Sequence, residues 1–181
     1  MDNQSVKIGL KYGAITGALI SLYALAEYLL GFHTTKLHIG EYTGYGSVII
    51  PFTTSFLTLW TIKKTNKGME KKKMLVEGIK ASGVNTLATA AIVSAFFYLY
   101  NSVINPKWMD LAYEYQLQKL IDSGIASEVA QAHMEQFLNF YEVNNQVIVT
   151  FFATLTQGAV IFACYILIMY QFCCNSKSKK S

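Results

Sequence analysis

Four long apolar runs, separated by polar segments, dominate the pattern of the chain. They lie at about 8–32, 42–62, 83–104 and 147–172. Each has about 20 residues or more, the length that a helix needs to cross a hydrocarbon core about 30 Å thick. The pattern predicts an all-α fold, an integral membrane four-transmembrane-helix bundle that forms a single membrane domain over residues 1–181.

The longest polar segment, 106–144, separates the third and fourth runs. Pro106 should end the third span, because proline disfavours the helical conformation in the residue before it. A helix from about 107 to 122 is then expected to stop near Gly124, and Ser127 is expected to cap a second helix. The segment is therefore predicted to be an extracytoplasmic two-helix hairpin.

The hairpin combines acidic residues with apolar residues at helical spacing. Its acids outnumber its two lysines: Asp110, Glu114, Asp122, Glu128, Glu135 and Glu142 against Lys107 and Lys119. Its apolar and aromatic side chains suggest a docking surface: Tyr113, Leu117, Met134, Phe137 and Tyr141. Because no nucleophile or cleft is indicated beside the acids, we interpret them as a solvated face and not as paired catalytic carboxylates.

The lysines indicate how the spans are oriented. All 15 basic residues are lysines, and most precede the first run, lie between the second and third runs, or follow the fourth. Four crossings put these clusters on one side, which the positive-inside rule assigns to the cytoplasm. We predict a multi-pass protein of the bacterial inner (cytoplasmic) membrane with both termini cytoplasmic. Its expected partners are membrane lipid and other membrane or periplasmic proteins. The absence of arginine argues against nucleic acid.

A cleaved signal peptide is the alternative for the first run. Lysines, an apolar stretch and Ala24-Leu25-Ala26 before Glu27 resemble a secretory signal with its cleavage site. Cleavage would leave three spans. The apolar run continues through Leu30, so we favour a retained helix, and a mature protein that begins at Glu27 would show otherwise.

Small residues recur every four positions in two of the runs. They are Gly9, Gly13, Gly17 and Ser21 in the first, and Gly78, Ser82, Thr86 and Ala90 in and before the third. Such rows let helix backbones approach closely, which is how helices associate in lipid, and the first has the spacing of a glycine zipper. We favour packing within one bundle over a seam between two copies, and a homo-oligomer remains the alternative.

Polar groups at membrane depth are the next candidates for function. Glu27, Asn85 and Gln157 fall inside the predicted spans. Such groups are costly in lipid and often functional. Three separate groups do not make a continuous path, so we interpret Glu27 as interfacial and the two amides as helix-packing groups. A small transporter or channel is the alternative.

Metal and thiol chemistry find little support in the sequence. The candidate ligands are His33, His38, Glu41 and His133, and the cysteines are Cys164, Cys173 and Cys174. The histidines lack the i, i+4 spacing of a helical zinc site, and the cysteines form no CxxC pair. We therefore expect no metal, no cofactor and no catalytic residue.

Three stretches resemble one family. They are KYGAITG at 11–17, GEYTGY at 40–45 and NPKWMDLAYEYQLQKLIDSG at 105–124. With the order of spans, they resemble the domain-of-unknown-function 4199 family of small bacterial integral membrane proteins. The resemblance covers nearly the whole chain, although the lysine-rich linker departs from it. It implies a membrane location and this topology, and it carries no activity.

These observations together favour a non-enzymatic protein. The leading expectation is an accessory, assembly or scaffold subunit that docks partners through the acidic hairpin. The alternatives are a small transporter or channel component that uses the polar groups of the spans, and, third, a membrane enzyme such as a thiol oxidoreductase.

Overall fold

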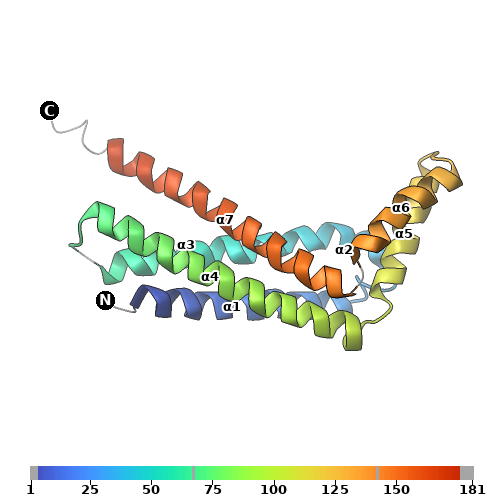
Figure 1. The fold of residues 1–181 in the computed structure, drawn as a ribbon, viewed down its shortest axis with the longest axis horizontal. Helices are drawn as coiled ribbons and strands as arrows, with labels where there is room; N and C mark the ends of the chain where they lie inside the picture. The colour runs from blue at the N-terminus through green and yellow to red at the C-terminus, as the bar shows by residue number, and fades with distance from the viewer. Residues whose placement is uncertain (1–3, 67, 142, 176–181) are drawn as a thin grey trace. The chain divides into compact units, whose positions relative to one another are not determined.

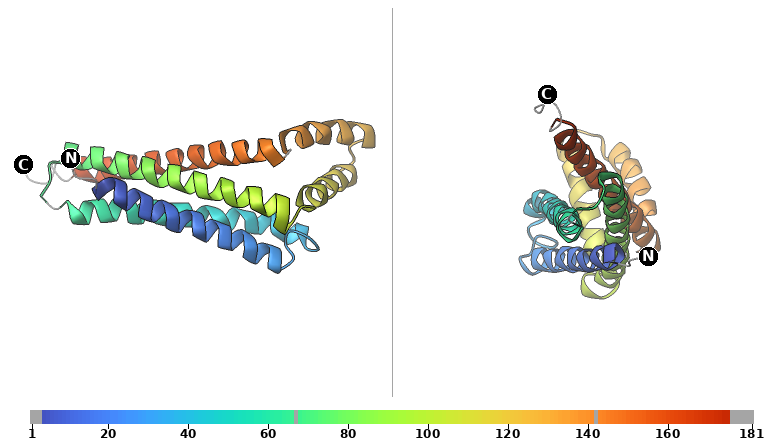
Figure 2. Two further views of the ribbon diagram at one scale, coloured as in Figure 1. Left: turned by 60° about the horizontal axis from the view of Figure 1, so that its bottom comes forward. Right: turned by 90° about the vertical axis from the view of Figure 1, so that its left-hand side faces the viewer.

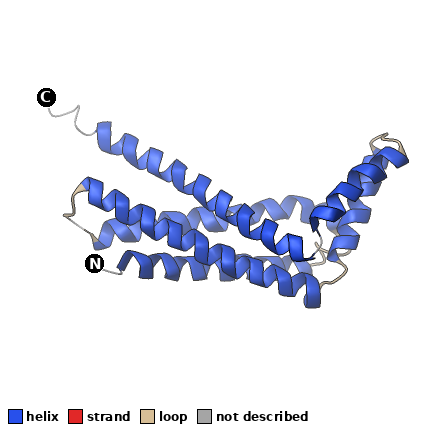
Figure 3. Cartoon of the chain, in the orientation of Figure 1, coloured by secondary structure: helices blue, strands red, loops and turns tan. Residues whose placement is uncertain are grey.

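The computed structural model describes residues 4–66, 68–141 and 143–175, and every regular element in these ranges is helical (Figure 3). The elements follow the order shown in Figure 1: α1 (Gln4–Leu29), α2 (Leu37–Thr43), the 3-10 helix η1 (Gly44–Val48), α3 (Ile49–Thr65), α4 (Lys71–Leu99), the π-helix η2 (Tyr100–Ile104), α5 (Trp108–Asp122), α6 (Ser127–Tyr141) and α7 (Val143–Asn175). The predicted all-α class is confirmed.

Four helical stretches of the described residues are long and apolar enough to cross a membrane. They are Gln4–Leu29, Leu37–Thr65, Lys72–Ile104 and Asn145–Tyr165. The four predicted runs each fall on one of them, with shifted boundaries. The third begins earlier than predicted because its lysine-rich lead-in is already helical.

The burial pattern of these helices reverses that of a water-soluble protein. Buried side chains include many polar groups: Thr16, Glu27, Thr54, Thr58, Asn85, Thr89, Asn101 and Asn105 are among them. Large apolar side chains are exposed instead, among them Leu22, Leu29, Phe52, Trp60, Val103 and Phe152. Exposed apolar surface of this extent needs a cover, and lipid provides it, while polar groups within the membrane pair with one another. The four long apolar helices and this burial pattern are those of a multi-pass membrane protein.

By its contacts the chain divides into two compact units. The first comprises Met1–Gly17, Val48–Ala90 and Phe152–Ser181, and the second comprises Ala18–Ser47 and Ala91–Phe151. Helices α1, α4 and α7 contribute residues to both.

In the first unit, α1 packs closely on α4 through glycine. A Cβ at Gly9 would collide with the carbonyl oxygen of Ala81, and one at Gly13 would lie 2.6 Å from that of Asn85. Gly158 of α7 is similarly close to Thr86 of α4. The small residues thus serve contacts within this chain, as side-by-side helices in lipid require.

Hydroxyl and amide groups link the same helices. The hydroxyls of Thr16 on α1 and Thr54 on α3 lie 2.7 Å apart. The side-chain nitrogen of Asn85 on α4 donates a 2.8 Å hydrogen bond to Thr58 on α3. The Thr89 hydroxyl donates to the side-chain oxygen of Asn85 at 3.3 Å. The sequence interpretation of Asn85 as a helix-packing group matches this geometry.

In the second unit, α5 and α6 lie side by side, as two views show (Figure 2). Gly124 has a φ of +91°, a left-handed conformation that suits glycine after a helix end. Ala130 and Met134 of α6 are buried. We call these helices the α5–α6 pair.

The connection between the first two spans differs from the expected loop. Gly31, with a φ of +80°, ends the first helical segment, and Leu37–Thr43 then forms α2. Gly40 lies against the backbone of Phe32, and the Tyr23 hydroxyl donates a 2.7 Å hydrogen bond to the carbonyl oxygen of Thr43. These contacts hold the residues of the connection against α1.

Candidate functional site

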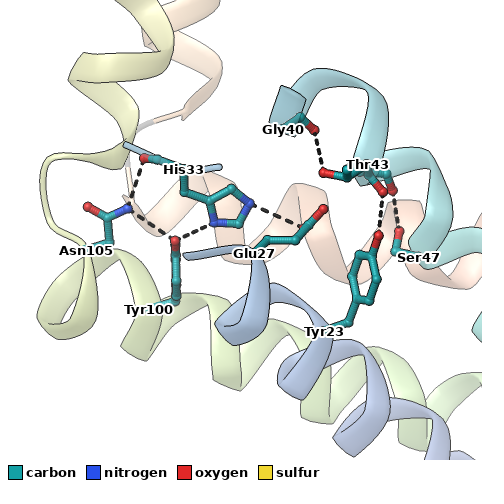
Figure 4. Close-up of polar contacts among 9 residues, drawn as sticks. Tyr23, Glu27, His33, Gly40, Thr43, Ser47, Tyr100 and Asn105 are labelled. Atoms are coloured by element: carbon teal, nitrogen blue, oxygen red, sulfur yellow. Dashed lines mark hydrogen bonds and ion pairs between the residues drawn. The ribbon is translucent and has the colours of Figure 1, made fainter. Parts of the chain in front are cut away.

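A cluster of buried polar residues lies in the second unit, at the base of α5 (Figure 4). Glu27 comes from the last turns of α1, His33 from the turn after it, Tyr100 from the start of η2, and Asn105 from the residue that follows η2. The exposed fractions of Glu27 and His33 are only 6% and 8%. We call these four residues the Glu27–Asn105 cluster.

The cluster is a continuous chain of contacts. His33 Nε2 lies 3.4 Å from Glu27 Oε2, and His33 Nδ1 lies 2.6 Å from the Tyr100 hydroxyl. The Asn105 amide nitrogen lies 3.2 Å from the same hydroxyl and 3.5 Å from the carbonyl oxygen of His33.

The donors and acceptors fix one order of protons along this chain. The Asn105 amide nitrogen can only donate, so the Tyr100 oxygen accepts from it and has its own proton free for His33 Nδ1. The His33 ring is then the tautomer with its proton on Nε2, which donates to Glu27. Burial lowers the pKa of His33 from its ordinary value of 6.5, against the opposing effect of Glu27. Each step therefore fits a neutral imidazole that donates its Nε2 proton to Glu27.

The second oxygen of Glu27 is left unpaired. Oε1 is buried and finds no hydrogen-bond partner among the described residues. The Tyr23 hydroxyl is near the carboxylate but directs its proton to the carbonyl oxygen of Thr43. His33 is the one ion-pair partner that the described part of the chain gives Glu27. A buried carboxyl group with so few hydrogen bonds is costly, so the Glu27–His33 contact is a candidate for a functional role and not for packing alone.

The π-helix η2 places the Tyr100 and Asn105 side chains within reach of each other. The backbone N–H of Asn105 donates to the carbonyl oxygen of Tyr100 at 2.7 Å, five residues back. A π-turn is a rare variation that recurs at functional sites. Pro106 then follows, and α5 begins two residues later at Trp108.

The cluster contacts the first residue of α5. The rings of His33 and Trp108 lie 4.5 Å apart between centroids, and the Tyr100 ring meets His33 edge-on at 5.7 Å. The His33 imidazole thus contacts both the polar side chains of the cluster and the first residue of α5.

Two further links hold α5. Lys119 forms an ion pair with Glu41 of α2, and the Tyr115 hydroxyl lies 3.3 Å from the same carboxylate. The hydrogen bond from Lys119 to Glu41 raises the pKa of this lysine. On the other side, Gln146 of α7 accepts a hydrogen bond from Asn101 and donates to the sulfur of Met109.

The predicted polar positions have different surroundings. Glu27 is buried in the cluster, Asn85 packs helices in the first unit, and Gln157 is half-buried on α7. His38 and His133 are exposed, and no group of three or more His, Cys, Asp or Glu side chains suited to a metal occurs among the described residues.

The predicted docking residues also differ from one another. Tyr113 and Leu117 are half-buried on α5, and Met134 is buried, so a partner could reach Met134 only after its surroundings rearranged. The side chains of Phe137 and Tyr141 lie outside the described part of the structure, as do those of Cys173 and Cys174. Cys164 is exposed with a free thiol.

Sequence reasoning missed half of the cluster. Tyr100 and Asn105 stand at the polar end of an apolar run, where such residues are common at a membrane surface. A signal was nonetheless present, because Tyr100, Asn101 and Asn105 supply three hydrogen-bonding side chains in six residues just before a proline.

Comparison with known proteins gives one match. A family model described as a protein of unknown function (DUF4199) matches residues 11–175. No curated protein and no solved structure matches the chain.

Proposed function

The chain belongs to the DUF4199 family of proteins of unknown function, and we propose that it is a non-enzymatic accessory subunit of the cytoplasmic membrane. In this proposal the α5–α6 pair is the docking element, and its partner is a protein with a basic surface.

The observation that carries this proposal is the charge on the α5–α6 pair. Five acids of the pair are exposed: Asp110, Glu114, Asp122, Glu128 and Glu135. Its one lysine, Lys119, is already paired with Glu41, which leaves Lys107, just before α5, to offset the acids. Complementary charge speeds association and selects partners, so a basic partner fits this surface.

Exposed apolar side chains stand beside these acids. Ile125 lies in the turn between the two helices, and Val129, in the first turn of α6, is 61% exposed. Buried apolar contact supplies affinity, while charge supplies specificity. The tip of the pair therefore offers both to a partner.

The positions of the lysines support an outward-facing pair. Exposed lysines cluster in the first unit, at Lys7, Lys11, Lys63, Lys64, Lys72 and Lys73. Four spans return the chain to the side on which it began, and lysine-rich connections stay in the cytoplasm. On this reasoning both termini are cytoplasmic and the α5–α6 pair is extracytoplasmic.

Neutralising the acids tests the docking proposal. The test variant is Glu114→Gln/Glu128→Gln/Glu135→Gln, and the control is Glu70→Gln, an exposed acid before α4. After mild chemical crosslinking and purification, the wild type and the control should retain a crosslinked partner that the triple variant loses, at equal amounts of protein in the membrane. Equal recovery of the same partner by all three proteins would refute docking through these acids.

A small transporter is the second candidate, and the buried Glu27–His33 contact favours it. Acids and histidines in series are the usual components of proton paths in membranes. The test is decay of a pH gradient in proteoliposomes with the wild type and Glu27→Gln. Flux that is absent from the wild type, or unchanged in the variant, rules out this candidate.

A further inference from the structure

We propose that Glu27 and His33 together form a binding site for one exchangeable proton, empty at neutral pH and filled under mildly acidic conditions. The site lies at the base of the α5–α6 pair, so its occupancy alters the contacts from which α5 starts. This proposal concerns the cluster alone and stands whether or not the α5–α6 pair docks a partner.

The first argument is the poorly compensated carboxyl group of the pair. Glu27 is 6% exposed, His33 is its one ion-pair partner among the described residues, and Oε1 has no hydrogen-bond partner there. A negative charge is costly in such a place, and binding a proton cancels it without adding any other atom. The proton comes from water and returns to it, so no co-reactant is needed.

The groups that face the pair do not remove the charge in another way. Tyr23 faces it from α1, Tyr100 from η2 and Trp108 from α5, and the Tyr28 ring packs against that of Tyr100. Tyrosine and tryptophan are residue types without a charge at neutral pH. Within the described residues, no lysine forms an ion pair with Glu27.

The second argument is the hydrogen-bond order, which a bound proton must disturb. A proton on His33 Nδ1 makes that atom a donor toward Tyr100, whose oxygen already accepts from Asn105. The Tyr100 proton then loses its acceptor. A proton on Glu27 Oε1 likewise creates a buried O–H donor that no described acceptor meets.

Whether the added proton is on His33 Nδ1 or on Glu27 Oε1, one buried hydrogen-bond donor is left unpaired. The cluster must rearrange to give that donor an acceptor. The residues that would move are Tyr100, Asn105 and Trp108, which form the junction between α4 and α5. Proton binding and the geometry at the base of α5 are thereby coupled.

The chain offers a direct measurement, because it contains only three histidines and two tryptophans. The full-length protein with ¹⁵N-labelled histidine, in lipid nanodiscs, is titrated from about pH 8 to about pH 5 by NMR. His33 is the buried one of the three histidines. At neutral pH the His33 signals should show the tautomer with its proton on Nε2, and they should change only below the ordinary histidine value of 6.5.

The coupling is read from Trp108 in a Trp60→Phe background, where it is the single tryptophan. Its emission should change over the same pH range as the His33 signals. In Glu27→Gln this transition should shift to lower pH or disappear from the range, because the carboxylate that holds the proton is gone. The control Glu70→Gln, an exposed acid before α4, should leave it in place.

Three results would each overturn the proposal, and two of them need no variant. They are a transition of His33 at or above the ordinary value of 6.5, a proton on Nδ1 at neutral pH, and an emission of Trp108 that does not change with the transition of His33. An unchanged transition in Glu27→Gln would also overturn it.

Discussion

The Nδ1 atom of His33 lies 2.6 Å from the hydroxyl of Tyr100, although the two residues are 67 positions apart in the chain. This contact ties the turn after α1 to η2. Asn105 and Pro106 follow η2, and α5 starts two residues after the proline, at Trp108. It also makes Tyr100 both an acceptor for Asn105 and a donor for His33. The stability of this junction should therefore depend on a single hydroxyl.

Replacing Tyr100 by Phe should destabilise the protein by about 1–3 kcal/mol. The ring is retained, but His33 Nδ1 and the Asn105 amide each lose a buried partner, and such groups cost about that much when left unpaired. The matched control is Tyr98→Phe on the same helix, whose side chain is 47% exposed and which should change stability little. Unfolding in mixed micelles with increasing denaturing detergent measures both. Equal stability of the two variants would contradict the role given to the Tyr100 hydroxyl.

Gly13→Ala should destabilise the protein, whereas Gly83→Ala should be neutral or slightly stabilising. A Cβ at Gly13 would lie 2.6 Å from the Asn85 carbonyl oxygen and 2.7 Å from the Ala88 Cβ, while a Cβ at Gly83 meets nothing within 4 Å. Both are helical, so each gains about 1 kcal/mol of helix propensity. Overpacking typically costs about 1–3 kcal/mol and should exceed that gain at Gly13 alone.

The same pair of variants distinguishes packing within the chain from a seam between copies. Loss of the folded monomer in Gly13→Ala supports packing of α1 on α4. Loss of a crosslinked dimer with a normally stable monomer would contradict it.

Thr58→Val should destabilise the first unit through its effect on Asn85. The substitution keeps the shape of a fully buried side chain but removes the acceptor of the 2.8 Å hydrogen bond from the Asn85 amide. Hydrogen bonds between membrane helices contribute about 0.6 kcal/mol on average and up to about 1.7 kcal/mol. A double-mutant cycle with Asn85→Ala should give a coupling energy in that range.

Thr53→Val is the control for this cycle. Thr53 is exposed and bonds only the carbonyl oxygen of Ile49 in its own helix, so its coupling to Asn85 should be near zero. A coupling energy for Thr58 no larger than that of Thr53 would refute the link between α3 and α4.

Stability should decrease as the pH falls below about 6.5, and His33 should account for part of this loss. Burial lowers the pKa of His33 in the folded protein, whereas the unfolded chain has the ordinary value of 6.5. Between the two values the unfolded state binds more protons, so its free energy falls relative to the folded state as the medium becomes more acidic. Above pH 6.5 this effect vanishes.

His33→Gln, which keeps a donor for Glu27, should flatten that decline. The measurement is the unfolding midpoint of both proteins at about pH 7.5 and about pH 5. His133→Gln, at an exposed position on α6, is the control and should follow the wild type. A wild type whose midpoint is equally high at both values would contradict the assignment of a lowered pKa to His33.

The spans and the α5–α6 pair could be predicted from the sequence because their signals are local. Each span is a run of apolar residues, and Gly124 ends α5 where a glycine after an amphipathic segment suggests it should. Helix α2 was missed because its seven residues carry no clear apolar periodicity, and its position depends on the contact of Gly40 with Phe32. Tertiary contact, and not local preference, decides that segment.

The cluster could be predicted only in part for the same reason. Glu27 was noticeable as the one acid inside an apolar run, but its burial depends on His33, which folds back across the end of α1 after the left-handed turn at Gly31. His33 is offered by the sequence only as a weakly supported metal ligand, since nothing near it in sequence shows that Tyr100 and Trp108 contact it. Contacts between distant positions of one chain leave little trace in a single sequence.

The sidedness of the α5–α6 pair tests the central claim most directly, because a docking surface for an external partner must be outside. In a variant without its native cysteines, Ser123→Cys reports on the turn of the pair and Thr65→Cys reports on the lysine-rich connection, both at exposed positions. A membrane-impermeant maleimide should label Ser123→Cys in intact cells and Thr65→Cys only after permeabilisation. Labelling of Thr65→Cys in intact cells, with Ser123→Cys protected, would contradict the account.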